Sequence, residues 1–163
     1  MIEKTLVLIK PDAVQRGLVG EITTRFEKAG LKIIGMKQVW ANEDFAKQHY
    51  TEDITKRRGE FVRNKLISSL HSGPVVALCL EGVKAISLVR KMVGDTESSK
   101  AAPGTIRGDY SHMTFDYCDT KGIALPNVVH ASGNEEDAKQ EIKVWFKNGE
   151  LHSYRIPHEH LVQ

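Results

Sequence analysis

This sequence is poor in several features that would place a protein in a specialised class. It has only two cysteines, Cys79 and Cys118, among 163 residues, which allow one disulfide at most and no disulfide scaffold. Lys and Arg total 23 against 21 for Asp and Glu, and the net charge of +2 is far from that of a dedicated nucleic-acid binder. The apolar stretches, such as 74–80, are too short to span a bilayer. We therefore expect no membrane insertion, and no nucleic acid as the main partner.

The N-terminus and the cysteines favour a cytoplasmic location. Residues 1–4 lead directly into a strand-like segment, without the charged, apolar and small-residue regions of a secretory signal in order. Cys79 lies inside the apolar run 75–80, where a buried free thiol is the ordinary interpretation. The length suits one compact domain over residues 1–163, and we find no internal repeat, low-complexity tract or linker.

Hydrophobic periodicity predicts a mixture of strands and helices along the chain. Short β-branched and apolar runs predict strands at 5–10, 32–40, 75–80 and 127–130. Apolar residues at helical spacing predict helices at about 18–29, 44–50, 61–70, 82–92 and 132–146. The order β-α-β, helices, β-α-β predicts the ferredoxin-like βαββαβ arrangement of the α/β (α+β) class, a four-stranded antiparallel sheet with added helices.

Two local predictions concern the C-terminal half of the chain. The pieces 114–117 and 123–125 are expected to pair as a small hairpin around a turn at 119–122. Ser132 followed by Glu135 fits a capping box, so we expect Ser132 to begin the last helix.

One of the seven histidines, His130, stands apart by its position. It ends a predicted strand at the edge of the sheet, just before a helix with an acidic first turn. Ser132 is close enough to hydrogen-bond back toward the ring, and Glu141 lies on the following helix. A hydroxyl and a carboxylate near an imidazole can select the tautomer and orientation that a nucleophilic nitrogen needs. His130 is therefore a candidate nucleophile, although its position alone also allows a structural role.

The other histidines are expected to be surface, turn or tail residues. They are His49, His71, His112, His152, His158 and His160. His158 and His160 flank Glu159, but these three residues do not form a complete metal-ligand set of known spacing.

Candidate phosphate-binding groups occur at the ends of several predicted elements. Lys10 ends the first strand, Arg90 lies on a helix before a loop with Thr96, and Arg107 belongs to the Gly- and Pro-bearing loop 103–109. One lysine and two arginines can neutralise a triphosphate, and the guanidinium fork matches pairs of phosphate oxygens. The sequence has neither a P-loop nor a protein-kinase glycine loop. A histidine nucleophile is the remaining candidate for phosphoryl transfer.

Four segments carry a resemblance to one enzyme family. TLVLIKPDAVQRGLVGEI, HSGPVVAL, PGTIRGD and NVVHAS, the last followed by EI and WF, resemble the signature segments of nucleoside diphosphate kinases in the same order. The resemblance implies that His130 takes a γ-phosphoryl group from a nucleoside triphosphate such as ATP and then gives it to a nucleoside diphosphate. It also implies Mg²⁺ as cofactor, held mainly by the nucleotide phosphates.

The same resemblance assigns roles to further residues. Lys10, Arg90, Thr96, Arg107 and Asn127 match the positions that hold the phosphates and ribose. Tyr50 matches a tyrosine near the catalytic histidine, and Ser132 and Glu141 match the pair that supports it. The family also implies a homo-oligomer, a hexamer or a tetramer, which associates through the second strand and a helix pair.

The sequence departs from the family pattern at two segments. Between Tyr50 and His71 it is longer than usual, so the base-stacking residue is Phe61, or Val62 in its place, with Leu66 on the other side. The segment 111–126 is also longer and forms an insertion. Ser98 stands where many members have a proline that helps subunit packing.

Three functions are compatible with these patterns. An active ping-pong kinase needs a neutral His130, so its activity should fall in acid as the imidazole protonates. A catalytically weak, nucleotide-binding regulatory module of the same fold is the alternative, motivated by the altered base-binding segment. A nucleic-acid-binding protein is opposed by the near-neutral charge and would be indicated by salt-sensitive DNA retention.

Overall fold

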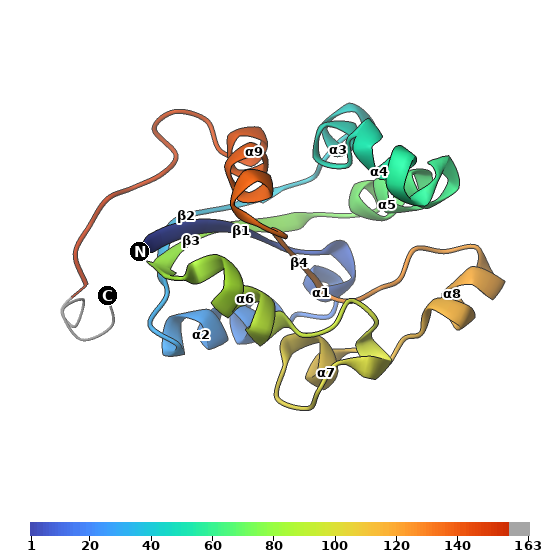
Figure 1. The fold of residues 1–163 in the computed structure, drawn as a ribbon, viewed down its shortest axis with the longest axis horizontal. Helices are drawn as coiled ribbons and strands as arrows, with labels where there is room; N and C mark the ends of the chain where they lie inside the picture. The colour runs from blue at the N-terminus through green and yellow to red at the C-terminus, as the bar shows by residue number, and fades with distance from the viewer. Residues whose placement is uncertain (157–163) are drawn as a thin grey trace.

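The computed structural model describes residues 1–156, whose helices cover both faces of an antiparallel sheet (Figure 1). The strands are β1 (Ile2–Ile9), β2 (Lys32–Val39), β3 (Val75–Val83) and β4 (Val129–Ala131), in the order β2-β3-β1-β4. After β1 come α1 (Pro11–Gln15) and α2 (Val19–Lys28), and after β2 come α3 (Glu43–His49), α4 (Glu52–Arg58) and α5 (Glu60–His71). After β3 come α6 (Ala85–Val93), the 3-10 helix η1 (Ser98–Lys100), α7 (Ile106–Tyr110) and α8 (Phe115–Lys121), and α9 (Glu135–Trp145) follows β4. The predicted ferredoxin-like arrangement is confirmed.

The central strands are buried on both faces because alternate side chains enter two separate cores. On β1, Val7 and Ile9 pack toward α2 and α6, whereas Leu6 and Leu8 pack toward α3, α5 and α9. In Figure 1 the first group of helices lies below the sheet and the second above it. This two-sided burial explains why residues 6–9 and 75–80 are continuously apolar. In the described range, no helix has both the length and the apolar character needed to cross a bilayer.

The expected hairpin in the segment 111–126 is wrong, because its first half forms helix α8. Thr114 caps the helix by accepting a hydrogen bond from the N–H of Tyr117 at 3.1 Å, and Gly122 ends it in the left-handed conformation with φ of 66°. Its buried residue is Cys118, which is a free thiol like the buried Cys79. The alternation of Phe115 and Tyr117, both largely exposed, imitated a strand pattern.

The structure corrects several further boundaries. Strand β3 continues through Gly82 to Val83, and α6 begins only at Ala85, so Gly82 does not open the helix as expected. The short helix α1 begins directly after the first strand at Pro11, because a proline is well tolerated at the first helical position. Helix α4 was not predicted, since its sequence is polar and contributes no buried residue.

The expected capping box at Ser132 is also wrong. Asn134 is the N-cap of α9, because its side-chain oxygen accepts a hydrogen bond from the N–H of Asp137 at 2.8 Å. Because Asn134 caps the helix, the hydroxyl of Ser132 is available for hydrogen bonds inside the protein. Residues 147–154 then run against β2, where His152 donates its backbone N–H to the carbonyl of Ile34. The pair His158 and His160 lies outside the described residues.

Candidate functional site

A cavity of about 1180 Å³ lies where the end of β1, strand β4 and the helices α3, α4, α5, α8 and α9 come together. Its lining includes Lys10, Tyr50, Leu66, Arg90, Thr96, Arg107, Asn127, His130 and Glu141, which are all residues singled out in the sequence. Ser132 is fully buried behind this surface, and Phe61 lies outside it. The fold therefore gathers nearly all the predicted residues around one open space.

His130 reaches the cavity because it lies on an edge strand whose entry is locally strained. Its strand β4 pairs only with β1, where His130 stands opposite Leu8. Val128, two residues earlier, has a positive φ of 61°, which is a genuine outlier for a β-branched side chain. Asp12 holds this conformation by accepting the N–H of Val128 at 3.0 Å, and the N–H of Lys10 donates to the carbonyl of Val128 at 2.9 Å.

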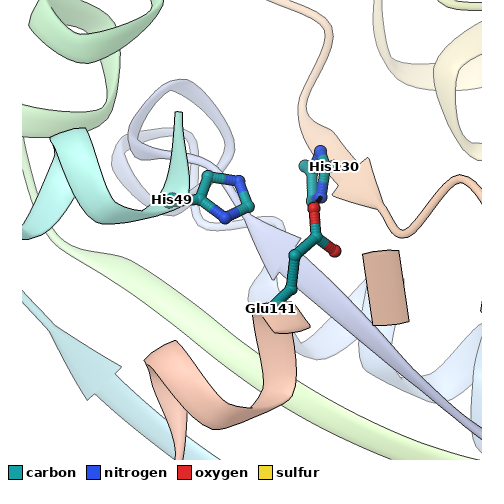
Figure 2. Close-up of side chains that lie close together, drawn as sticks. All are labelled: His49, His130 and Glu141. Carbon is teal, nitrogen blue, oxygen red and sulfur yellow. Dashed lines mark hydrogen bonds and ion pairs between the residues drawn. The ribbon is translucent and has the colours of Figure 1, made fainter. Parts of the chain in front are cut away.

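Glu141 on α9 fixes the tautomer of His130. Its Oε1 lies 2.9 Å from His130 Nε2, and a carboxylate can only accept, so Nε2 carries the proton (Figure 2). The lone pair of the neutral ring is then on Nδ1. Ser132 donates its hydroxyl to Glu141 Oε2 at 2.5 Å and makes no hydrogen bond to the ring. The expectation that Ser132 bonds back to His130 directly is therefore corrected: it acts through Glu141.

The charge of Glu141 is strongly favoured. Burial by itself would raise the pKa of this carboxyl, but the interaction with His130 and the hydrogen bonds from His130 and Ser132 outweigh burial and lower the pKa to about 2. Glu141 is thus an ionised acceptor at any physiological pH. It is also suited to stabilise positive charge on His130.

Lys10 is an almost fully buried cation held by its neighbours. Its Nζ donates to the carbonyl of Leu125 at 3.1 Å and to Asn127 Oδ1 at 2.9 Å, and the amide of Asn127 donates onward to the carbonyl of Thr96 at 2.8 Å. Burial lowers the pKa of Lys10, and nearby Arg107 lowers it further, while Asp12 opposes both. An anion in the cavity would relieve this unfavourable burial of charge.

Arg107 is a second buried cation, positioned through backbone carbonyls. Its Nη1 donates to Gly94 at 3.0 Å and its Nη2 to Val129 at 2.8 Å. Its Nε is buried and has no hydrogen-bond partner among the residues of the described range. Burial, followed by the charge of Arg90, lowers the pKa of Arg107 to about 10. The guanidinium groups of Arg90 and Arg107 and the ammonium of Lys10 therefore line the same cavity, an arrangement that suits an anionic ligand.

The mouth of the cavity lies between α4, α5 and the segment 111–126. Val62 and Leu66 of α5 line one wall, whereas Phe61 is 68% exposed and lies beneath the ammonium of Lys65 on the outer surface. The opposite wall comes from Phe115, Cys118 and residues 123–125. Lys65 also forms an ion pair with Asp119 at 3.2 Å, which links α5 to α8 across the opening.

His49 is a residue of this site that the sequence analysis placed on the surface. It is only 8% exposed, and its ring packs perpendicular to that of His130 with centroids 4.6 Å apart (Figure 2). Its position immediately before Tyr50, itself expected near His130, was the signal that could have found it. Tyr50 lies beside it and is buried, which raises the pKa of its phenol.

His49, His130 and Glu141 also form the one cluster of three potential metal ligands in residues 1–156, with ligand atoms within 4.8 Å of one another. Two imidazoles and one carboxylate do not suit Mg²⁺, which prefers oxygen ligands. The protein side chains therefore fit Mg²⁺ only where an oxygen-rich ligand supplies most of the coordination.

Comparison with known proteins gives consistent similarities. A family model described as nucleoside diphosphate kinase matches residues 3–151. A nucleoside diphosphate kinase of Borreliella burgdorferi is 46% identical over 156 residues, which are 95% of this chain and 93% of that protein. One of Pyrococcus furiosus is 48% identical over 153 residues, which are 94% of this chain and 88% of that protein.

Two solved structures are similar over nearly their whole length. A transition state mimic of nucleoside-diphosphate kinase from Borrelia burgdorferi, with bound vanadate and ADP, has a TM-score of 0.97 at 45% identity and covers 99% of this chain and 96% of its own. A halophilic nucleoside diphosphate kinase from Halobacterium salinarum in complex with CDP has a TM-score of 0.85 at 36% identity, with coverage of 100% and 99%.

Proposed function

The chain belongs to the nucleoside diphosphate kinase family, a family of phosphotransferases, and from this premise we propose that His130 carries the transferred phosphoryl group. The observation that supports the proposal most directly is the hydrogen bond between Glu141 and His130 Nε2, which leaves the lone pair on Nδ1. A neutral imidazole nitrogen with a fixed orientation is a competent nucleophile. Lys10, Arg90 and Arg107 line the same cavity and can neutralise the phosphates that approach His130.

The proposed reaction has two displacement steps. In the first, Nδ1 of His130 attacks the γ-phosphorus of a nucleoside triphosphate, and the bond to the β–γ bridging oxygen breaks. The nucleoside diphosphate leaves with that electron pair, and the imidazolium that forms is stabilised by Glu141. In the second, a terminal oxygen of another nucleoside diphosphate attacks the phosphorus. The P–N bond then breaks and its electron pair returns to Nδ1, so the neutral enzyme is restored.

The roles of the surrounding residues follow from their placement. We assign Lys10, Arg90 and Arg107 to the phosphate oxygens, where charge is neutralised as the phosphoryl group moves. Asn127 and Thr96, which are joined by a hydrogen bond, are assigned to the ribose and phosphates. Mg²⁺, held mainly by the nucleotide phosphates, supplies further charge neutralisation when it is bound. Tyr50 is assigned a place beside His130, where its buried ring excludes water.

The base is proposed to lie at the mouth of the cavity between Val62 and Leu66 on one side and residues 123–125 on the other. We assign Val62 rather than Phe61 to the base because Val62 lines the cavity and Phe61 does not. An apolar clamp contacts any base through its faces, while phosphate and sugar contacts are common to all nucleotides. Broad tolerance for the base is the expected consequence.

The test is the intact mass of the protein after brief incubation with ATP and Mg²⁺. Wild type should gain one phosphate, which is lost in acid or on addition of GDP, whereas His130→Ala should gain none and still bind ATP. An unmodified wild type that binds ATP would refute the relay and favour the regulatory module. A phosphate retained by His130→Ala would place the nucleophile elsewhere.

We also propose that the protein is a cytoplasmic homo-oligomer, a hexamer or a tetramer. Association is supported by the exposed apolar side chains of Met36 on the edge strand β2 and of Trp40 just after it, which are 53% and 66% exposed. The cytoplasmic location is supported by the two free cysteines. Sedimentation velocity on wild type and Met36→Lys would test the association. A wild type that sediments as a monomer would refute it.

A further inference from the structure

His49 carries an unexplained polar atom at the centre of the site. Its side chain is buried, and Nε2 has no hydrogen-bond partner in the described part of the chain. A buried polar group without a partner is costly, so such an atom requires a physical reason. The proposed mechanism makes no use of this residue.

Trp145 determines which nitrogen of His49 carries the proton. The indole Nε1–H of Trp145, itself fully buried on α9, points to His49 Nδ1 at 3.3 Å. An indole can only donate, so His49 Nδ1 accepts and carries the lone pair. In a neutral ring the proton is then on Nε2. The ring stays neutral because burial, helped by nearby His130 and opposed by Glu141, lowers the pKa of His49 to about 3.

The unpartnered N–H faces the ring of His130. The planes of the two rings are 89° apart and their centroids 4.6 Å apart. Figure 2 shows His49 with its edge toward the face of His130, while Glu141 approaches His130 from a different side. An N–H donor directed at an aromatic face is a weak but real hydrogen bond. This contact accounts for the buried nitrogen.

We propose that His49 is a positioning residue: its Nε2–H, oriented by Trp145, packs on the face of His130 and holds that ring so that Nδ1 points into the cavity. The proposal rests on the proposed role of His130 as nucleophile. Glu141 holds one edge of the ring, which still leaves rotation about that hydrogen bond. Contact with the face of the ring removes this remaining freedom, and nucleophilic attack depends steeply on such alignment.

A metal ion shared by His49, His130 and Glu141 explains the geometry less well. The lone pair of an imidazole nitrogen lies in the plane of its ring. An ion placed in the plane of His49 and near its Nε2 would therefore stand over the face of His130, where that ring offers no lone pair. The perpendicular packing thus favours an N–H contact over common coordination.

The experiment compares wild type, His49→Phe, Trp145→Phe and the control His112→Phe, which changes an exposed histidine outside the cavity lining. His49→Phe keeps an aromatic edge against His130 but has no N–H. Trp145→Phe keeps a ring but cannot fix the tautomer. Rapid-quench measurement of the phosphorylation rate with ATP and Mg²⁺, the dissociation constant of ADP, and ¹⁵N NMR of histidine-labelled protein are the three readouts.

We expect His49→Phe to slow phosphorylation by about 10-fold or more while ADP affinity changes less than about twofold. Trp145→Phe should be intermediate, and His112→Phe should match wild type. In wild type, the NMR signals of His49 should show a neutral ring protonated on Nε2, and in Trp145→Phe a mixture of tautomers. A merely structural role would not produce this tautomer change together with an unchanged ADP affinity.

Two results would overturn the proposal: a His49→Phe variant phosphorylated at the wild-type rate, or a wild-type His49 protonated on Nδ1. If His49→Phe fails to fold, the spectra of wild type and Trp145→Phe still decide the tautomer. A wild type that takes no phosphate from ATP would instead refute the proposed nucleophile, while the tautomer of His49 would remain a separate result.

Discussion

Ser132 donates its hydroxyl to Glu141 over 2.5 Å, on the carboxylate oxygen opposite to the one that bonds His130. The same hydroxyl lies within 3.3 Å of the N–H of Leu6 on the central strand β1. The serine therefore ties the carboxylate to strand β1. Its influence on His130 passes entirely through Glu141.

This relay predicts non-additive effects of substitution. Glu141→Gln should slow phosphorylation of His130 by about 100-fold, because an amide does not hold the tautomer as a carboxylate does, and Ser132→Ala by about 10-fold. The double variant should be no slower than Glu141→Gln alone, since Ser132 acts through Glu141. Rapid-quench rates of the three variants test this. Additive losses would show an independent role for Ser132.

The lowered pKa of Glu141 predicts a difference in acid stability. A carboxyl whose pKa falls on folding stabilises the native state above its unfolded pKa of about 4.3, and this contribution is lost as the pH falls toward about 2. In urea unfolding, the stability difference between wild type and Glu141→Gln should therefore shrink between about pH 5 and pH 2. A difference that stays constant over this range would contradict the ionised, hydrogen-bonded carboxylate.

Arg107→Lys should impair catalysis although it preserves the charge. An ammonium cannot reproduce the planar fork that bonds the carbonyls of Gly94 and Val129 and still presents N–H groups to a phosphate. We expect kcat/KM to fall by about 100-fold, the effect of losing charged hydrogen bonds of about 1.5–3 kcal/mol. Steady-state kinetics should show no such loss in Arg16→Lys, an exposed arginine outside the cavity lining. Equal losses in both variants would point to general destabilisation.

The base-binding wall can be tested with two neighbouring residues. Val62→Ala removes apolar surface from the cavity lining and should raise the nucleotide KM about 5–10-fold with little change in kcat. Phe61→Ala is the matched control, because this side chain is exposed outside the cavity, and its KM should stay within about twofold of wild type. The reverse ranking would mean that α5 turns Phe61 inward when a nucleotide binds.

Helix α8 lines the cavity mouth opposite Val62 and Leu66, and removal of its N-cap should destabilise this wall. Thr114→Ala removes the side-chain acceptor of the Tyr117 N–H, at a cost of about 1 kcal/mol, and should raise KM because α8 lines the cavity mouth. kcat should be unchanged, since His130 and Glu141 lie on other elements. Thr114→Ser, which keeps the cap, should restore KM. A fall in kcat with unchanged KM would refute this role of the insertion.

The sequence predicted the sheet and the charged half of the cavity well because both depend on local patterns. The apolar runs that form β1 and β3 are long enough to be buried on both faces. Arg107 lies in the short helix α7, not in a loop as expected, but directly after the Pro- and Gly-bearing residues 103–104. Lys10 directly follows β1, and His130 is the middle residue of β4 rather than its last residue as expected; the sheet order places these two strands side by side. These features need little knowledge of distant contacts.

The remaining features depend on tertiary contacts that a local pattern does not contain. Adjacent residues on a helix point about 100° apart, so the small rotation of α5 that selects Val62 over Phe61 is not encoded in the spacing. His49 is buried by residues distant in the sequence, His130 of β4 and Trp145 of α9, whose rings pack against it. α8 was mistaken for a hairpin because two exposed aromatics alternated, while its cap at Thr114 decided the structure.

The hydrogen bond from Arg107 to the carbonyl of Val129 has a further consequence for how the molecule avoids aggregation. Because His130 pairs with Leu8, the backbone groups of its neighbour Val129 point away from β1, toward the open edge of the sheet. Unpaired groups on such an edge invite pairing with a strand of another chain. The guanidinium of Arg107, which contributes positive charge to the cavity, donates a hydrogen bond to the carbonyl of Val129 on this edge. The arginine that we assign to the phosphates thus also covers the sheet edge, and its loss would leave the carbonyl of Val129 on that edge without this partner.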